Sequence, residues 1–206
     1  MSGERLVRAR RDRSRPRLRA SNPGEPRWHW LATRELHRGR VRIDADEVEL
    51  PSGERTVFEV DRSIPFSVAT LILDGEHVLV SRQYRYAIDR WILDLPGGAG
   101  RSGEAPEAAA RRELAEELGL AAGELLPLHT FFPSPGRSVW ATHLFLAARV
   151  RPGRAAQDDR PGRVQQVRMS LAELDGLISA GEIVDPPLLV ARTMAAAKGL
   201  LPPIGA

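Results

Sequence analysis

One short segment, residues 106–118, constrains this chain more than any other feature. Its Ala and Leu content favours a helix, Pro106 stands where a first-turn proline is tolerated, and Gly119 stands where a helix is expected to end. The segment carries three glutamates at the spacing i, i+3 and i+4: Glu113, Glu116 and Glu117. This spacing stacks the carboxylates on one helix face, where they repel one another. A divalent cation, which prefers oxygen ligands, would reverse that repulsion.

The neighbouring residues bear on whether the glutamates form a metal-binding face or belong to an ordinary solvated helix. Ala110, Leu114 and Leu118 recur at four-residue steps and predict an apolar stripe, so the acids lie beside a buried face. The preceding segment 95–100 is rich in Gly and lets the backbone approach a ligand closely. Taken alone, however, a helix rich in Arg and Glu is also typical of a solvated surface with i,i+4 ion pairs.

The longer pattern resembles the signature of the Nudix hydrolases, G-x5-E-x7-R-E-U-x-E-E-x-G-U, where U is aliphatic. Every fixed position is matched, by Gly98, Glu104, Arg112, Glu113, Leu114, Glu116, Glu117, Gly119 and Leu120. The chain is therefore identified as a member of that superfamily. The resemblance implies an enzyme that uses a divalent metal to hydrolyse a nucleoside diphosphate linked to another group.

The resemblance also implies roles for particular residues. The metal ligands would be Glu113, Glu116, Glu117 and the backbone carbonyl of Gly97, with Mg²⁺ as the expected ion and Mn²⁺ as its substitute. Glu116 and Glu117 would thereby be catalytic. Glu104 and Arg112 would hold loop and helix in register, and Arg112 would either orient the acids or form a structural ion pair. Metals that bridge a diphosphate neutralise charge and lower the pKa of a bound water.

Further segments resemble the ADP-ribose pyrophosphatase subgroup, and the likeness covers roughly residues 28–198. They are 48–54 (VELPSGE), 82–85 (RQYR), 93–98 (LDLPGG), 134–136 (SPG) and 143–147 (HLFLA). This likeness implies ADP-ribose or another nucleotide sugar as substrate, with a nucleoside monophosphate and a sugar phosphate as products. It also implies a homodimer built on the N-terminal strands.

Two departures from the subgroup concern the substrate and the general base. Trp140 replaces the acidic residue that commonly follows SPG by four positions; it would stack on a base, line an apolar pocket or pack in the core. The loop 151–163 lacks the catalytic glutamate that the subgroup often carries there. Asp158 and Asp159 are the candidates for its role, or are simply solvated acids.

Four other side chains are candidates for substrate binding. Arg85 follows an apolar strand and precedes the catalytic loop, so its guanidinium is placed to reach a phosphate, and Arg82 is a second candidate. Either arginine would otherwise pair with a surface acid. Trp28 and Trp30 share one strand face and would stack on a base or pack a dimer interface.

The chain is expected to contain three parts. Residues 1–26 form a disordered Arg-rich tail, in which the first twenty residues hold eight Arg against Glu4 and Asp12. Residues 27–61 form an antiparallel sheet for dimerisation, and residues 62–200 form the Nudix catalytic domain. Nucleic acid would be bound only through the tail, whose other interpretation is a solvated leader.

The strand and helix patterns predict an α/β sandwich, an α/β/α Nudix fold around a mixed sheet with a small N-terminal antiparallel sheet. Strands are expected near 38–43, 46–50, 55–60, 66–73, 77–82, 91–95, 125–132, 139–150 and 163–169, and further helices near 171–180 and 187–198. Asp74-Gly75 is a hairpin signal. Residues 95–100 are expected to be a loop.

Composition narrows the classes of function. The chain has no cysteine, which excludes thiolate chemistry, and no apolar run long enough to suggest a membrane span. The expected location is the cytoplasm. Two alternative functions stay open: a nucleoside triphosphate or capped-RNA pyrophosphohydrolase, and a regulator that binds a nucleotide sugar without cleaving it.

Overall fold

The computed structural model describes residues 24–153 and 164–205. They divide into two compact units. The first contains the described residues up to Pro65 together with Phe132–Ala141, and the second contains Phe66–Phe131 and the described residues from Thr142 onward. Most of the Arg-rich tail lies outside the described residues, as do Asp158 and Asp159 of the loop.

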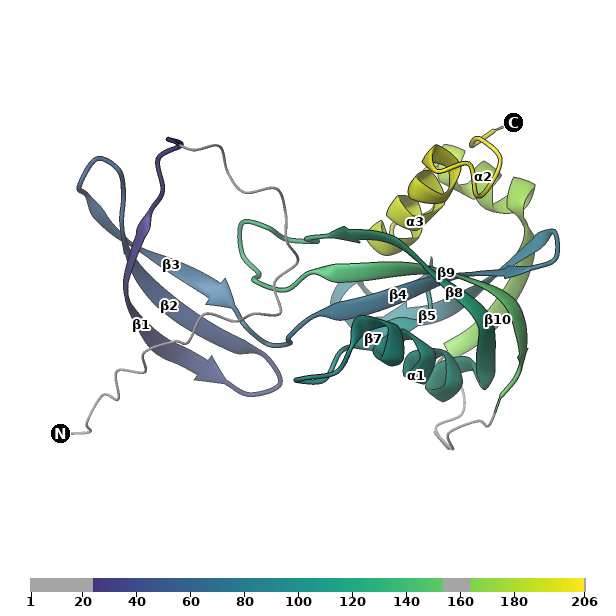
Figure 1. Cartoon of the computed structure of the whole chain (residues 1–206), viewed down its shortest axis with the longest axis horizontal. Helices are drawn as coiled ribbons and strands as arrows, with labels where there is room; N and C mark the ends of the chain where they lie inside the picture. The colour runs from purple at the N-terminus through teal and green to yellow at the C-terminus, as the bar shows by residue number, and fades with distance from the viewer. Residues whose placement is uncertain (1–23, 154–163, 206) are drawn as a thin grey trace. The chain divides into compact units, whose positions relative to one another are not determined.

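The first unit is an antiparallel sheet of three strands in the order β1-β2-β3, β1 (His29–Arg38), β2 (Arg42–Glu49) and β3 (Arg55–Asp61), as Figure 1 shows. The prediction of a small N-terminal antiparallel sheet is confirmed. The prediction of separate strands near 38–43 and 46–50 is wrong, because β2 runs unbroken through Asp44 and Asp46. Both acids are buried, and Arg62 reaches them from beyond β3 at 3.5 and 2.6 Å. Contacts with a residue distant in the sequence therefore allow β2 to continue through these polar residues.

The second unit is built on a mixed sheet in the order β10-β5-β4-β9-β8, with β6 paired to β5 and β7 paired to β4. The strands are β4 (Ser67–Asp74), β5 (His77–Arg85), β6 (Arg90–Asp94), β7 (Gly97–Ala99), β8 (Leu120–Phe131), β9 (Thr142–Pro152) and β10 (Val164–Ser170). β4 and β9 run parallel, and the other neighbours run antiparallel.

Local signals placed most of these strands, with three corrections, one being that β8 begins at Leu120 and not near 125. The Asp74-Gly75 turn joins β4 to β5 as predicted, with Gly75 at φ 63°, a value that favours glycine. Residues 97–99, expected to be loop, form β7 because they pair with β4. The strand expected from 139 begins only at Thr142.

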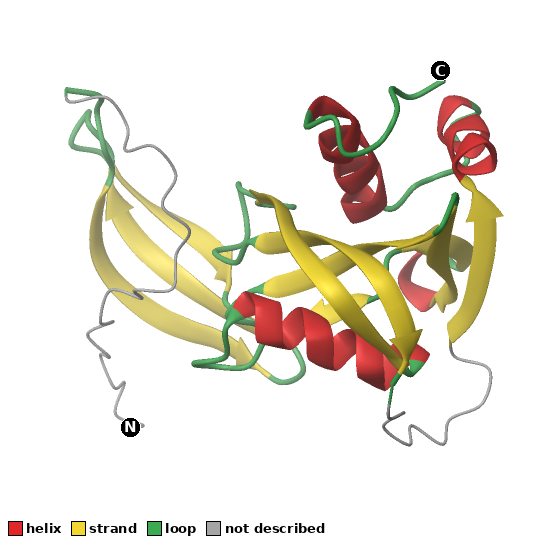
Figure 2. Ribbon diagram, turned by 45° about the vertical axis from the view of Figure 1, so that its right-hand side comes forward, coloured by secondary structure: helices red, strands yellow, loops and turns green. Residues whose placement is uncertain are grey.

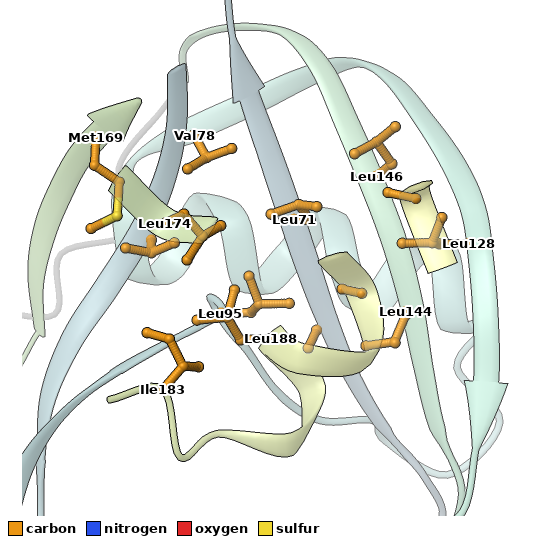
Figure 3. Packing of buried hydrophobic residues seen from close by; sticks show 14 residues of the cluster. Leu71, Val78, Leu95, Leu128, Leu144, Leu146, Met169, Leu174, Ile183 and Leu188 are labelled. Carbon is orange, nitrogen blue, oxygen red and sulfur yellow. The ribbon is translucent and has the colours of Figure 1, made fainter. Parts of the chain in front are cut away.

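Helices cover both faces of this sheet, as Figure 2 makes visible. α1 (Pro106–Leu118) packs on one face through a cluster that includes Val68, Ile72 and Phe145. α2 (Leu171–Ser179) and α3 (Pro186–Ala197) pack on the other face through Leu71, Val80 and Leu144. Figure 3 shows this second cluster. Successive strand residues thus alternate between the faces, and the predicted α/β/α arrangement is confirmed.

Among the residues that the structure describes, no helix has the length and apolar character needed to cross a bilayer.

Candidate active site

The acidic helix α1 has the predicted bounds and a partly buried face. Pro106 occupies its first turn, and Gly119 ends it in the left-handed conformation with φ 64°, which a residue with a Cβ rarely adopts. Ala109, Ala110 and Leu114 are buried against the sheet. Glu113 and Glu117 are only partly exposed, so the solvated-helix interpretation does not describe them.

The Gly-rich strand β7 presents its backbone to this helix. Pairing with β4 uses Pro96 and Gly100: Thr70 N–H donates to Pro96 C=O at 3.0 Å, and Gly100 N–H donates to Phe66 C=O at 2.9 Å. Gly97 and Ala99 lie at the alternate positions, whose polar groups point away from β4 in an antiparallel pair. The Gly97 N–H accordingly donates to Glu117 Oε2 at 3.0 Å.

Arg112 ties the loop before α1 to the helix. Its Nε and Nη2 donate to the two oxygens of Glu104 at 2.9 and 3.1 Å, and Nη2 also donates to Ala99 C=O at 3.1 Å. Its Nη1 donates to Glu113 at 2.6 Å and to Glu116 at 3.2 Å. All three nitrogens are engaged in these contacts, so Arg112 does not offer a free donor to a substrate. Whether it orients the acids or serves as a structural ion pair stays a prediction.

Glu104 is the second member of this pair. The Arg112 guanidinium and the Arg101 backbone N–H hold the pKa of Glu104 at about 2. The carboxylate is therefore charged throughout the physiological range. This geometry is the register-holding contact that the resemblance implies for the two residues.

Two of the acids, Glu113 and Glu117, lie close to β7. A Cβ on Gly98 would stand 2.7 Å from the Glu113 carboxylate, so a larger residue there would displace that carboxylate. Burial raises the pKa of Glu117 to about 7; the Gly97 N–H opposes this, and the charges of Glu113 and Asp94 add to it. Glu117 therefore lies among other acids, and a bound cation would offset the repulsion between their negative charges.

The donor set fits a hard divalent ion, although the carboxylates do not converge by themselves. Within 24–153 and 164–205, no three acidic or imidazole side chains gather closely enough to form a metal cluster. Arg112 binds Glu113 through Oε1 and Glu116 through Oε2, while Glu117 turns to Gly97. The set nevertheless consists entirely of oxygen donors, and burial together with mutual repulsion leaves Glu117 short of a counter-charge.

Arg85 and Arg82, three residues apart, lie on opposite faces of β5. Ser81 of β5 pairs with Asp94 of β6. Arg85 lies four residues after Ser81 on the same strand, so its side chain shares the face of Ser81 and faces α1. There Arg85 forms an ion pair with the buried Asp94. Arg82 faces the other side, where it stacks 4.8 Å above the Trp91 ring and donates to Gln165. The structure brings Arg85, and not Arg82, to the face that carries the glutamates.

Two buried acids that the sequence analysis did not single out, Asp94 and Asp185, also feel the charge of Arg85. Burial raises the pKa of Asp94 to about 6 against the opposing charge of Arg85. Asp185 caps the start of α3 by accepting from the Leu188 N–H at 3.0 Å, and burial raises its pKa too. A lone acid in the otherwise apolar segment 91–95 was the available signal for Asp94.

The three tryptophans predicted for substrate binding all belong to the first unit. Trp28 packs its ring 4.8 Å from Phe58, and Trp30 donates to Thr33, yet both indoles stay about half exposed. Trp140 is half-buried, with an Nε1–H that is buried without a hydrogen-bond partner among the described residues. Their part in binding stays a prediction.

Comparisons with known proteins bear on the family and the fold. The model of the NUDIX domain matches residues 64–189. An ADP-ribose pyrophosphatase from Bacillus subtilis (strain 168) is 31% identical over 159 residues, covering 75% of this chain and 85% of the relative. A methanol dehydrogenase activator from Bacillus methanolicus is 31% identical over 164 residues, covering 78% and 88%. The crystal structure of an ADP compounds hydrolase superposes with a TM-score of 0.68 at 24% identity, over 85% of this chain and 97% of that one.

Proposed function

This chain belongs to the Nudix family of hydrolases, and from that membership we propose that it is a metal-dependent pyrophosphatase of ADP-ribose or a related nucleotide sugar. Water attacks one phosphorus atom, and the products are a nucleoside monophosphate and a sugar phosphate. The single observation that carries the proposal is the contact of Gly97 with Glu117, because it joins the Gly-rich strand to the acidic helix at one place. The likeness to an ADP-ribose pyrophosphatase supports the substrate class.

The proposed metal site uses Glu113, Glu116, Glu117 and the Gly97 carbonyl, with Mg²⁺ or Mn²⁺ as the ion. A bound divalent ion supplies charge neutralisation of the diphosphate and a water of lowered pKa. Arg112 keeps Glu113 and Glu116 at the helix surface, and Glu104 keeps Arg112 in place. In the described part of the chain the carboxylates do not converge, so a bound ion would require their side chains to turn toward it.

Arg85 is the proposed phosphate contact. Its side chain is 47% exposed, and among residues 24–153 and 164–205 its one recorded partner is Asp94, at Nη2. The remaining N–H groups are available to phosphate oxygens, and a guanidinium binds such oxygens in a bidentate manner. In the transition state this contact would offset charge that develops on the phosphoryl oxygens.

The substitution Glu117→Gln tests the function. Glutamine keeps the shape and the acceptor for the Gly97 N–H but loses the charge that binds the metal. We expect turnover of ADP-ribose, measured as release of AMP with Mg²⁺, to fall by about a hundredfold or more, as for the removal of one charge-stabilising group. Glu107→Gln on the same helix is the matched control, since the ion pair that the described part of the chain gives Glu107 is with Arg111. Full activity of the Glu117→Gln variant would refute the assigned metal site.

The first unit is the proposed homodimer interface. β1 is almost entirely exposed, although it carries apolar side chains. The exposed apolar residues of the unit are Trp28, Trp30, Leu31, Leu36, Val41 and Val57. A second copy of the chain would cover them. Light scattering should give twice the mass of the chain, and Leu36→Glu with Val57→Glu should shift it toward the monomer.

A further inference from the structure

Asp94 is a buried carboxylate with one side-chain partner. It is 1% exposed, and in the part of the chain that the structure describes the only side chain that donates to it is Arg85, at Oδ2. Its Oδ1 is buried and accepts no hydrogen bond. Removing a carboxylate from water costs several kcal/mol, and a single ion pair with one unpartnered oxygen offsets that cost poorly. A residue selected only for packing would not be an aspartate.

The surroundings of Asp94 give no other use for its charge. Ser81 stands opposite it on β5, and Thr70 belongs to β4; the hydroxyls of both are buried and lack partners among the described residues. All three side chains lie on the α1 face, since their strand neighbours Leu79, Ile72 and Leu93 fix the alternation. Neither hydroxyl forms a hydrogen bond with the Asp94 carboxylate, so Arg85 is the described side chain that Asp94 binds.

The pair lies on the face of the sheet that carries α1 and its proposed metal ligands. Asp94 stands three residues before Gly97, whose N–H donates to Glu117 Oε2 at 3.0 Å. The two residues of the pair come from adjacent strands of a hairpin, β5 and β6, and the hairpin fixes the backbone that carries them. Arg85 is thus anchored at Nη2, with Nε and Nη1 left to face an incoming anion.

We propose that Asp94 is a positioning residue, which fixes the Arg85 guanidinium beside the glutamates so that its free N–H groups meet a phosphate oxygen of the diphosphate. The inference rests on the proposed function, because it takes Arg85 as the phosphate contact. Asp94 itself does not touch the substrate. Its effect passes through Arg85, and this separates a positioning role from a purely structural one.

A double-mutant cycle tests the proposal with a readout that needs no turnover. The probe is α,β-methylene-ADP, a diphosphate that the enzyme cannot cleave, and its dissociation constant is measured by calorimetry with and without Mg²⁺. Arg85→Ala should weaken binding about tenfold or more, and Asp94→Ala should weaken it by a similar factor, since each removes or frees a charge-assisted contact. The double variant should bind no more weakly than Arg85→Ala. Asp94→Asn, which keeps a neutral acceptor, should lie between Asp94→Ala and the wild type.

The control and the outcomes separate the inference from the proposed function. Arg168 pairs with Asp74 at 2.8 Å on another part of the sheet and is 51% exposed, so Arg168→Ala is a matched loss of an arginine and should leave binding unchanged. If Arg85→Ala binds normally, the phosphate contact itself is wrong. If Arg85→Ala weakens binding but Asp94→Ala does not, or if their effects add, the positioning role of Asp94 is overturned while the proposed function stands. Unfolding in urea confirms that each variant is folded.

Discussion

Arg112 and Glu104 are joined by two parallel hydrogen bonds, from Nε at 2.9 Å and from Nη2 at 3.1 Å. Glu104 lies in the loop before α1, eight residues ahead of Arg112, and both side chains are less than a fifth exposed. The pair therefore closes the loop onto the helix. Since Arg112 also holds Glu113 and Glu116, the position of the loop and the positions of the acids depend on one guanidinium.

Arg112→Lys should impair both stability and catalysis. A lysine ammonium cannot reproduce the two parallel bonds to Glu104 and the contacts to Ala99, Glu113 and Glu116. We expect the free energy of unfolding in urea to fall by about 1–2 kcal/mol, the value of a lost charged hydrogen bond at a partly exposed site. Arg111→Lys, whose arginine is 43% exposed, should change it by less than about 0.5 kcal/mol. Equal losses in both variants would contradict the special place of Arg112.

The adjacent glycines Gly97 and Gly98 should tolerate alanine differently. A Cβ at Gly97 would stand 2.1 Å from the Val68 carbonyl oxygen, which is backbone and cannot move aside. We expect Gly97→Ala to lower the free energy of unfolding by about 3 kcal/mol or more. At Gly98 the obstacle is the movable end of Glu113, so Gly98→Ala should fold almost normally but bind Mg²⁺ about tenfold more weakly. Calorimetry and urea unfolding measure the two effects, and normal Mg²⁺ affinity in Gly98→Ala would count against Glu113 as a ligand.

The metal-free protein should lose stability as the pH rises through 6. The pKa of Asp94 is about 6 in the fold against an ordinary 3.8, because burial disfavours the charged form. A raised carboxyl pKa means that the group contributes its stability fully below pH 3.8 and loses it as the pH rises through 6.

Asp94→Asn isolates this effect. In EDTA, the free energy of unfolding of Asp94→Asn minus that of the wild type should rise by about 2 kcal/mol between pH 4 and pH 8. Glu104, with a pKa of about 2, acts in the opposite sense, but its contribution is lost only as the pH falls from 4.5 toward 2, below this window. A difference between the two proteins that does not change with pH would show that Asp94 is already charged at low pH.

Among the contacts that lie away from the surface, the ion pair of Arg192 and Asp175 should cost the most stability when it is broken. Arg192 is fully buried and donates to both oxygens of Asp175 at 2.7 and 2.6 Å, and to the Pro202 carbonyl at 2.9 Å. Arg192→Met leaves Asp175 buried without its partner and should cost about 3–5 kcal/mol in urea unfolding. Adding Asp175→Leu should recover most of the loss, because an apolar pair replaces the ionic one. If the double variant is no more stable than the single one, lost packing and not the unpaired charge is the cause.

Sequence reasoning predicted those parts of the fold whose signals are local. The bounds of α1 follow from Pro106, Gly119 and the apolar stripe between them, and the β4–β5 hairpin follows from Asp74-Gly75. The glutamates also reach the predicted face, because helical spacing alone fixes it.

The remaining features depend on partners that lie far away in the sequence. β2 persists through Asp44 and Asp46 because Arg62 neutralises Asp46 and shares Asp44 with Arg42. Residues 97–99 become a strand because β4 offers an edge to them. The separation of Arg82 from Arg85 follows from strand alternation, yet the face that each takes is decided by Trp91 and Asp94. These choices are tertiary and cannot be read from propensity.

Only Gly119 separates the last residue of α1 from the first residue of β8. A link of one residue couples the rotation of the helix to the register of the strand. One residue inserted there would turn the helix by about 100° about its axis and carry the acids away from β7. The segment 101–105 should resist changes of length for a related reason, because Glu104 within it must stay eight residues ahead of Arg112 to keep their two hydrogen bonds.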